Sequence, residues 1–92
     1  MFARVATYSG DPDELVRGFD RSLEELAKLE GFSHAYFGVD RSGGRAMSIT
    51  LWETEAALEG SAESAQRLRS EAAEPSGATV DTVTHFEIAL TA

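Results

Sequence analysis

The stretch that decides the fold is a strand-to-helix junction at residues 48–58, which reads Ser-Ile-Thr-Leu-Trp-Glu-Thr-Glu-Ala-Ala-Leu. Residues Arg45–Glu53 are dense in apolar and β-prone side chains, so they predict a strand. Thr54 predicts the N-cap of a helix, because a hydroxyl at that position accepts a hydrogen bond from the first turn. The apolar positions of this helix recur every three or four residues and predict one buried face: Leu58, Ala62, Ala65, Leu68 and Ala72.

The chain before this junction predicts a strand, a helix and another strand. Residues Phe2–Ser9 alternate with the two-residue period of a strand. Asp11 predicts a helix N-cap with Pro12 at the first helical position, and Gly31 predicts the residue that ends this helix. One face of the strand carries Phe2, Arg4, Ala6 and Tyr8, and the helix presents an apolar stripe of Leu15, Phe19, Leu23 and Leu26.

The remaining elements complete a known arrangement. Residues Phe32–Asp40 predict a strand joined to the next one by a Gly43-Gly44 turn, and Ala78–Leu90 predicts a final strand. In this final strand Val80, Thr82, Thr84 and Phe86 are expected on one face. The order β-α-β-β-α-β predicts an α+β, ferredoxin-like fold with one antiparallel sheet and both helices on one of its faces.

Composition limits the class of protein. With 92 residues, the chain is expected to form one domain spanning residues 1–92. Its net charge of −8 argues against nucleic acid and against an anionic membrane surface, since both recruit clustered Lys and Arg. The absence of cysteine excludes disulfides, thiolate metal sites and a Cys nucleophile. No apolar run approaches the length of a membrane span, so a cytoplasmic location is the default expectation.

Both faces of the predicted sheet carry apolar residues, although the helices cover only one. The simplest cover for the other face is the sheet of a second copy, so we expect a homodimer whose two sheets close a barrel. The alternative is a monomer with a partly apolar exposed sheet.

Two junctions carry a resemblance to a known family. The strand exit Trp52-Glu53-Thr54, followed by Ala56-Ala57, and the junction Glu30-Gly31-Phe32 resemble the antibiotic biosynthesis monooxygenase-like domains of the dimeric α/β-barrel superfamily. The resemblance implies a small-molecule pocket between sheet and helices. It also implies possible activities that include cofactor-free oxidation of reduced aromatic compounds and haem degradation.

The resemblance also suggests substrate-binding residues. Trp52 matches a pocket Trp of the quinone-forming members, whereas Ser48 and Leu58 stand where those enzymes carry Asn and Tyr. We therefore expect Trp52, Ser48 and Leu58 to line the pocket, and the alternative for Trp52 is a core side chain. The second helix lacks the Trp and the His of haem-degrading members.

Three side chains are candidate proton acceptors: His34, Tyr36 and His85. A solvated or hydrogen-bonded histidine is the commoner situation on a strand. Tyr36 shares a face with His34, and that face could line the pocket or a dimer interface. The histidines have no metal-ligand spacing, so no metal site is expected. Arg67 and Arg69 are interpreted as cations that suit a helix C-terminus, with anion binding in the pocket as the alternative.

The sequence thus favours a cofactor-independent, monooxygenase-like protein that acts on a small apolar or aromatic molecule and needs no metal or organic cofactor. Loss of the Asn and Tyr favours an alternative, a non-catalytic small-molecule-binding or stress-associated dimeric barrel. A haem-binding protein is the second alternative.

Overall fold

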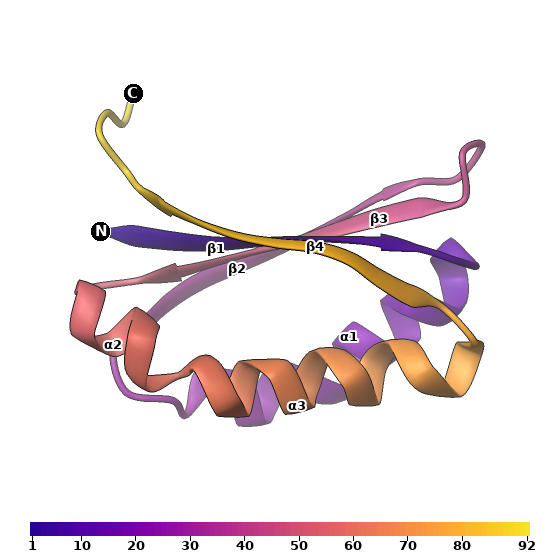
Figure 1. Ribbon diagram of the computed structural model, residues 1–92, viewed down its shortest axis with the longest axis horizontal. Coiled ribbons are helices and arrows are strands. Elements are labelled where there is room, and N and C mark those ends of the chain that lie inside the picture. The colour runs from indigo at the N-terminus through magenta and orange to yellow at the C-terminus, as the bar shows by residue number, and fades with distance from the viewer.

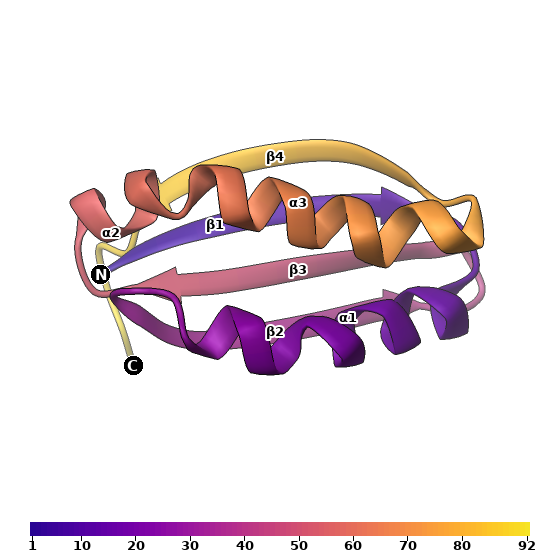
Figure 2. The same ribbon diagram turned by 90° about the horizontal axis from the view of Figure 1, so that it is seen from below.

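The fold is described from a computed structural model that covers residues 1–92. One antiparallel four-stranded sheet with the order β2-β3-β1-β4 lies over the helices, which all cover the same face (Figures 1 and 2). The predicted β-α-β-β-α-β order and the α+β class are confirmed. The elements are β1 Phe2–Ser9, α1 Pro12–Ala27, β2 Phe32–Asp40, β3 Arg45–Trp52, α2 Glu55–Gly60, α3 Ala62–Ala73, a 3-10 turn Glu74–Ser76 and β4 Thr79–Glu87.

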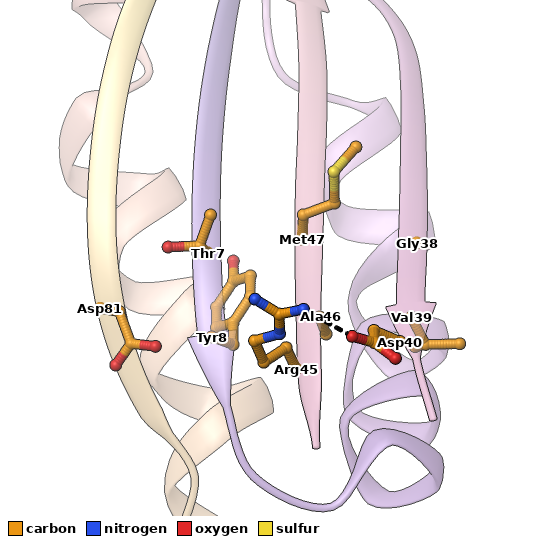
Figure 3. Close-up of a pocket in the computed structure, with 9 residues that line it drawn as sticks. All are labelled: Thr7, Tyr8, Gly38, Val39, Asp40, Arg45, Ala46, Met47 and Asp81. Atoms are coloured by element: carbon orange, nitrogen blue, oxygen red, sulfur yellow. Dashed lines mark hydrogen bonds and ion pairs between the residues drawn. The ribbon is translucent and has the colours of Figure 1, made fainter. Parts of the chain in front are cut away.

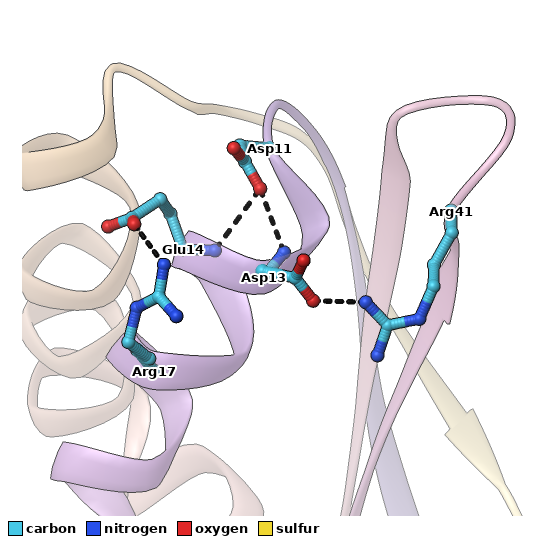
Figure 4. A network of polar contacts seen from close by, with 5 residues as sticks. All are labelled: Asp11, Asp13, Glu14, Arg17 and Arg41. Atoms are coloured by element: carbon cyan, nitrogen blue, oxygen red, sulfur yellow. Dashed lines mark hydrogen bonds and ion pairs between the residues drawn. The ribbon is translucent and has the colours of Figure 1, made fainter.

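The start of α1 is capped as predicted. The Asp11 carboxylate accepts hydrogen bonds from the backbone N–H of Asp13 at 2.9 Å and of Glu14 at 3.3 Å (Figure 4). Arg41, in the β2–β3 turn, forms an ion pair with Asp13, and Arg17 forms one with Glu14. The first turn of α1 therefore makes polar contacts both within its own helix and with the β2–β3 hairpin.

The end of α1 differs from the prediction. The helix ends at Ala27 with Lys28 as C-cap, so Gly31 does not directly follow the last turn. Gly31 is needed later, in the turn that enters β2, because its φ of 75° lies in the left-handed region. A Cβ at this position would also meet the Ala57 Cβ at 2.3 Å, so the close approach of another segment demands glycine here.

The single second helix of the prediction is wrong, because the chain breaks at Ser61 into α2 and α3. Thr54 does cap α2, accepting a hydrogen bond from the Ala57 backbone N–H at 3.0 Å. The Ser61 hydroxyl donates to the Leu58 carbonyl at 2.7 Å, and this local bond competes with a continuous helix. As a consequence, Ala62 is exposed rather than part of the buried stripe.

Strand β4 is shorter than predicted and contains a bulge. Thr7 pairs with Thr82, but Tyr8 pairs with Val80, so Asp81 is an extra residue. The Asp81 carboxylate accepts hydrogen bonds from the hydroxyls of Ser9 and Thr79. The bulge turns Val80 to the helix side, which corrects the expectation that Val80 shares a face with Thr82.

The core lies between the sheet and the helices. Of the predicted α1 stripe, Leu15, Phe19 and Leu26 are buried, whereas Leu23 is 42% exposed and its predicted burial is wrong. The reason is that α3 covers only part of the α1 circumference. Two apolar clusters result, one of Ala6, Tyr8, Leu15, Phe19, Ala46, Ala72 and Ala73, the other of Leu26, Trp52, Leu58 and Leu68.

The opposite face of the sheet has no helix on it (Figure 1). The strand registers place three rows of four residues across it, in the order β2-β3-β1-β4. These rows are His34-Leu51-Ala3-Phe86, Tyr36-Ile49-Val5-Thr84 and Gly38-Met47-Thr7-Thr82. These twelve positions contain no Asp, Glu, Lys or Arg, whereas the next row toward the β2–β3 turn, Asp40-Arg45-Ser9-Thr79, carries an ion pair.

Candidate functional site

A small cavity with a mainly apolar lining and a few polar groups lies between the sheet and the two long helices. Its volume is about 30 Å³, room for one or two water molecules. Strands β1, β2 and β3 supply its floor and helices α1 and α3 its roof. The lining residues are Arg4, Tyr8, Phe19, Ser22, Leu26, Phe37, Ser48, Thr50, Ala65, Leu68 and Arg69.

Arg4 is the most unusual member of this lining, because its charged side chain is only 3% exposed. Its Nε donates to His85 Nε2 at 3.2 Å, its Nη1 donates to the Ser61 hydroxyl at 3.0 Å, and its Nη2 donates to the Leu58 carbonyl at 2.7 Å. These bonds join β1 to β4 and to the break between α2 and α3, so they hold the guanidinium in one place.

Both charged side chains that line the cavity are positive. The ion pairs of the structure involve Arg17, Arg41, Arg45 and Arg67 and include neither Arg4 nor Arg69. Burial and the neighbouring positive charge of Arg69 lower the pKa of Arg4 to about 10. Burial likewise lowers the pKa of Arg69. Both groups remain charged at neutral pH, so the cavity holds positive charge without a carboxylate to balance it.

Hydroxyl groups complete the polar lining. The Tyr8 and Ser48 hydroxyls share a hydrogen bond of 2.9 Å across β1 and β3. Burial raises the pKa of Tyr8, so its phenol stays protonated at neutral pH and is available as a donor. The Thr50 hydroxyl accepts the Trp52 indole N–H at 2.9 Å.

Four of the six residues predicted for the site lie at or next to this cavity. Ser48 lines it directly, and His85 reaches it through Arg4. Trp52 is fully buried beneath it, with the Arg4 guanidinium 5.7 Å from the centre of its ring. Leu58 contributes its backbone carbonyl to Arg4, while its side chain packs with Trp52 in the core.

The geometry around His85 limits what this histidine can do. Its Nε2 accepts the Arg4 hydrogen bond, which assigns the proton of the neutral ring to Nδ1. Burial, followed by the charges of Arg4 and Arg69, lowers the pKa of His85, so the ring is neutral at pH 7. A neutral His85 therefore positions Arg4, and its basic nitrogen is already occupied.

The other two predicted residues, His34 and Tyr36, lie on the helix-free face and not in the cavity. Tyr36 is 58% exposed, and the His34 ring nitrogen Nδ1 shares a hydrogen bond of 2.9 Å with the Ser33 hydroxyl. The sheet separates both from Arg4, so they cannot act together with the cavity residues within one chain.

A second, open depression of about 460 Å³ covers the end of the sheet next to the β2–β3 turn (Figure 3). Asp40 and Arg45 form an ion pair at 2.7 Å across its edge, and Asp81 lies on the opposite side. Its charges are paired or solvated and none of the predicted site residues lies in it, so it is a weaker candidate than the buried cavity.

Sequence reasoning did not single out Arg4 and Thr50 as parts of the site. A signal for Arg4 was present, since it is a charged residue on the strand face that also carries Phe2, Ala6 and Tyr8. For Arg69 the sequence favours the helix C-terminus and leaves a place in the pocket as the alternative, and the structure places this side chain at the cavity. No three His, Asp or Glu side chains gather in a way that could hold a metal ion. None of the helices combines the length and the apolar character that a membrane crossing requires.

The known proteins that this chain resembles are found by comparing structures and not by comparing sequences. No protein-family model and no curated protein sequence matches the chain. A solved structure described as a putative antibiotic biosynthesis monooxygenase from Bordetella bronchiseptica matches 97% of this chain and 97% of its own, with TM-score 0.73 and 15% identity. SnoaB, a cofactor-independent oxygenase from Streptomyces nogalater, matches 98% of this chain and 94% of its own, with TM-score 0.65 and 21% identity.

A third similar structure is the heme-degrader MhuD from Mycobacterium tuberculosis, with two hemes bound in its active site. It matches 100% of this chain and 99% of its own, with TM-score 0.77 and 18% identity. The chain therefore has the ferredoxin-like fold of the antibiotic biosynthesis monooxygenase-like proteins, as the two junctions in its sequence indicated. At these identities the likeness concerns the fold, and the activity must be argued from the site.

Proposed function

We propose that the chain is a cofactor-independent, monooxygenase-like protein that binds a small apolar or aromatic molecule between the sheet and the α1–α3 helix pair. The observation that supports this is the partly enclosed cavity, where two arginines and several hydroxyl groups lie in an otherwise apolar layer. SnoaB has the same fold and is described as a cofactor-independent oxygenase.

The chemistry uses the substrate itself as the source of electrons. A substrate with an activated CH₂ group next to an aromatic ring loses a proton to solvent water, because the basic nitrogen of His85 is already bonded to Arg4, and the carbanion passes an electron to dioxygen. Recombination forms a C–O bond, and loss of water leaves a carbonyl, so the CH₂ group and O₂ become C=O and H₂O. Positive charge at Arg4 and Arg69 favours the ionised form of the substrate over the neutral one.

The size of the cavity restricts how a substrate enters. At about 30 Å³ it accepts one functional group and no aromatic ring. A ring must either stay outside or separate α1 from α3 near Ser22 and Leu68. Substrates are therefore expected to be small, and bulky tricyclic compounds are expected to be poorer.

Oxygen uptake tests the proposal. Quinols and dihydroxyanthracenone are supplied as substrates, and uptake should fall in Tyr8→Phe and Ser48→Ala, which remove cavity hydroxyls. His34→Ala and Tyr36→Phe lie on the opposite face and should leave uptake unchanged. A reversed pattern would place the predicted proton acceptors His34 and Tyr36 in the real site. Absence of uptake with every substrate would refute the oxygenase.

A non-catalytic binding protein is the second candidate function. The small cavity supports it, as does the engagement of the basic nitrogen of His85 by Arg4. Saturable binding of a small molecule without oxygen uptake would favour this candidate.

Haem binding remains the third candidate because the structure resembles MhuD. The residues present do not fit an iron ligand: α2 and α3 contain no histidine, and the Nε2 of His85 is already bonded to Arg4. Titration with haem should therefore produce no Soret band characteristic of an axial protein ligand. The appearance of such a band would make haem binding the leading candidate function.

We also propose that the partner of the helix-free face is a second copy of the chain. Tyr36 and Phe86 are 58% and 52% exposed on this face, and the twelve positions of its three rows away from the β2–β3 turn carry no charge. Two copies with a net charge of −8 each repel one another, and contact through positions without charged side chains adds the least further repulsion. Ile49→Glu at the centre of the face should convert a dimer to a monomer in sedimentation, whereas Glu24→Gln on the exposed side of α1 should not. A monomeric wild-type protein would refute the proposal.

A further inference from the structure

We infer that the segment after β4, residues 88–92, docks on a second copy of the chain and places Leu90 in the open depression next to that copy's β2–β3 turn. The inference rests on the proposed pairing of two helix-free faces, and it adds which segment of one copy meets which site of the other. It also gives an occupant to a depression that the proposed small-molecule site does not use.

The segment 88–92 reads Ile-Ala-Leu-Thr-Ala and carries no charged side chain. After the Ile88 backbone N–H has donated to the Met1 carbonyl at 2.9 Å, the chain turns to the side of the sheet opposite the helices (Figure 1). Leu90 is 93% exposed there, more than any other large hydrophobic residue. A single exposed leucine is common on protein surfaces. What distinguishes Leu90 is its place on the side of the sheet where a second copy is expected.

The depression opens on the same side of the sheet. Thr7 and Met47 line it, and both belong to one row of the helix-free face. Its charged groups are already bonded within the chain: Asp40 pairs with Arg45 at 2.7 Å, and the Asp81 carboxylate accepts hydrogen bonds from two hydroxyls (Figure 3). An uncharged segment can therefore enter the depression without breaking an ion pair. The volume of about 460 Å³ exceeds that of one leucine side chain and leaves room for the residues next to it.

Leu90 cannot reach the depression of its own chain. Ile88 is bonded to Met1 at one end of the sheet. Thr82 pairs with Thr7 beside the depression, toward the other end. The six residue spacings from Thr82 to Ile88 cover about 20 Å of strand. Leu90 follows Ile88 by two residues, which span at most about 7 Å. Only the depression of another copy is therefore within its reach.

The sizes of the side chains favour one orientation of the two copies. The row at the end of the segment contains three large side chains, His34, Leu51 and Phe86. The row at the depression contains one, Met47. A two-fold axis across the strands lays each large row over a small one, which keeps the sheets evenly spaced and their contact free of voids. The same axis lays segment 88–92 of each copy over the depression of the other. An axis along the strands would instead bring the two segments together and leave both depressions empty.

The competing explanation is that segment 88–92 is unattached in solution and Leu90 contacts nothing. Leu90→Ser separates the two explanations, because it removes the apolar side chain and leaves the helix-free face unchanged. Leu23→Ser is the matched control, since Leu23 is an exposed leucine on α1, on the other side of the sheet. Burial of one leucine side chain corresponds to roughly tenfold to a hundredfold in affinity. In sedimentation, Leu90→Ser should therefore weaken dimerisation by at least about tenfold, and Leu23→Ser by less than about twofold.

Disulfide cross-linking tests where the segment lies, because the natural chain contains no cysteine. One preparation carries Leu90→Cys and another carries Met47→Cys, so a disulfide between the two must join two copies. The preparations are mixed, left to exchange subunits and oxidised. The mixed disulfide should form at least about tenfold faster than in a mixture of Leu90→Cys with Glu24→Cys, because contact raises the effective concentration of the two thiols. Glu24 is exposed on α1 and serves as the control position. Circular dichroism confirms that each variant is folded.

Three results would overturn the inference: Leu90→Ser dimerises as well as the wild-type protein, Leu90→Cys links only to itself, or the mixed disulfide forms no faster than with Glu24→Cys. The test is separable from that of the dimer. A wild-type dimer that Ile49→Glu dissociates and Leu90→Ser leaves intact would refute only the docking of the segment. A monomeric wild-type protein would refute the pairing of the faces and the docking with it.

Discussion

The close contact between α1 and α3 at Gly18 lies beside the groove between these helices and provides a sharp test of the fold. A Cβ added at Gly18 would lie 2.4 Å from the carbonyl oxygen and 2.8 Å from the Cα of Ala72. Ordinary contacts begin near 3.4 Å, so α3 would have to move by 3.4 − 2.4, or about 1 Å. The obstacle is backbone, which cannot rotate away as a side chain does.

Two opposing effects determine the stability of Gly18→Ala. Alanine gains about 1 kcal/mol over glycine inside a helix. Overpacking costs about 1–3 kcal/mol, and the upper half of that range applies because the contact is with backbone. The expected net loss is about 1–2 kcal/mol, or roughly 6–12 °C in Tm for a domain of this size. Gly60→Ala is the matched control: no atom lies within 4 Å of its Cβ, so a gain of up to about 1 kcal/mol is expected.

Urea and thermal unfolding, followed by circular dichroism at one fixed protein concentration, measure both variants. The concentration is held constant because a dimer would make Tm depend on it. The two substitutions should shift Tm in opposite directions. If Gly18→Ala raised Tm by as much as Gly60→Ala, the close packing of α1 against α3 would be wrong.

Two further predictions follow from burial and charge. Leu15→Ala should lower the free energy of unfolding by about 2–5 kcal/mol, because Leu15 is fully buried, whereas Leu23→Ala should cost less than about 1 kcal/mol at its exposed position; equal losses in chemical denaturation would contradict this packing. In an NMR titration, the pKa of His85 should lie below the usual 6.5, because burial and then the charges of Arg4 and Arg69 lower it. The unfolded chain then binds that proton more readily, so the His85 contribution to stability is present above pH 6.5 and is lost as pH falls through the folded-state pKa. A pKa for His85 at or above 6.5 would show that the two arginines do not act on it.

Local signals in the sequence predicted most of the fold. Strands β1 and β2 have the predicted bounds, and the caps at Asp11 and Thr54 form as expected. These features depend on neighbouring residues, through the two-residue period of a strand or the bond from a cap to its first turn. Two of the errors occur where distant segments meet. Gly31 is required by Ala57, and Leu23 is exposed because α3 does not reach it.

The site could be predicted only in part, since a cavity depends on which faces meet. The sequence placed His34 and Tyr36 on the same face of one strand, and this is observed. It could not tell whether that face meets the helices or remains uncovered. The strand registers decide this by placing Arg4 in one row with Ala35, Thr50 and His85 on the helix side. The sequence predicts Ser48 at the site, whereas it indicates for Arg4 only a position on one face of a strand.

The sequence by itself determined the order of the elements, the amphipathic helices and the resemblance to monooxygenase-like domains at the Trp52 junction. Each of these features depends on residues that lie only a few positions apart in the sequence. Only the tertiary structure decided that Arg4 and Arg69, 65 positions apart, line one cavity with no carboxylate between them. Whether a charged side chain finds an ion-pair partner depends on the tertiary structure: the chain has sixteen acidic residues, and none of them forms an ion pair with Arg4.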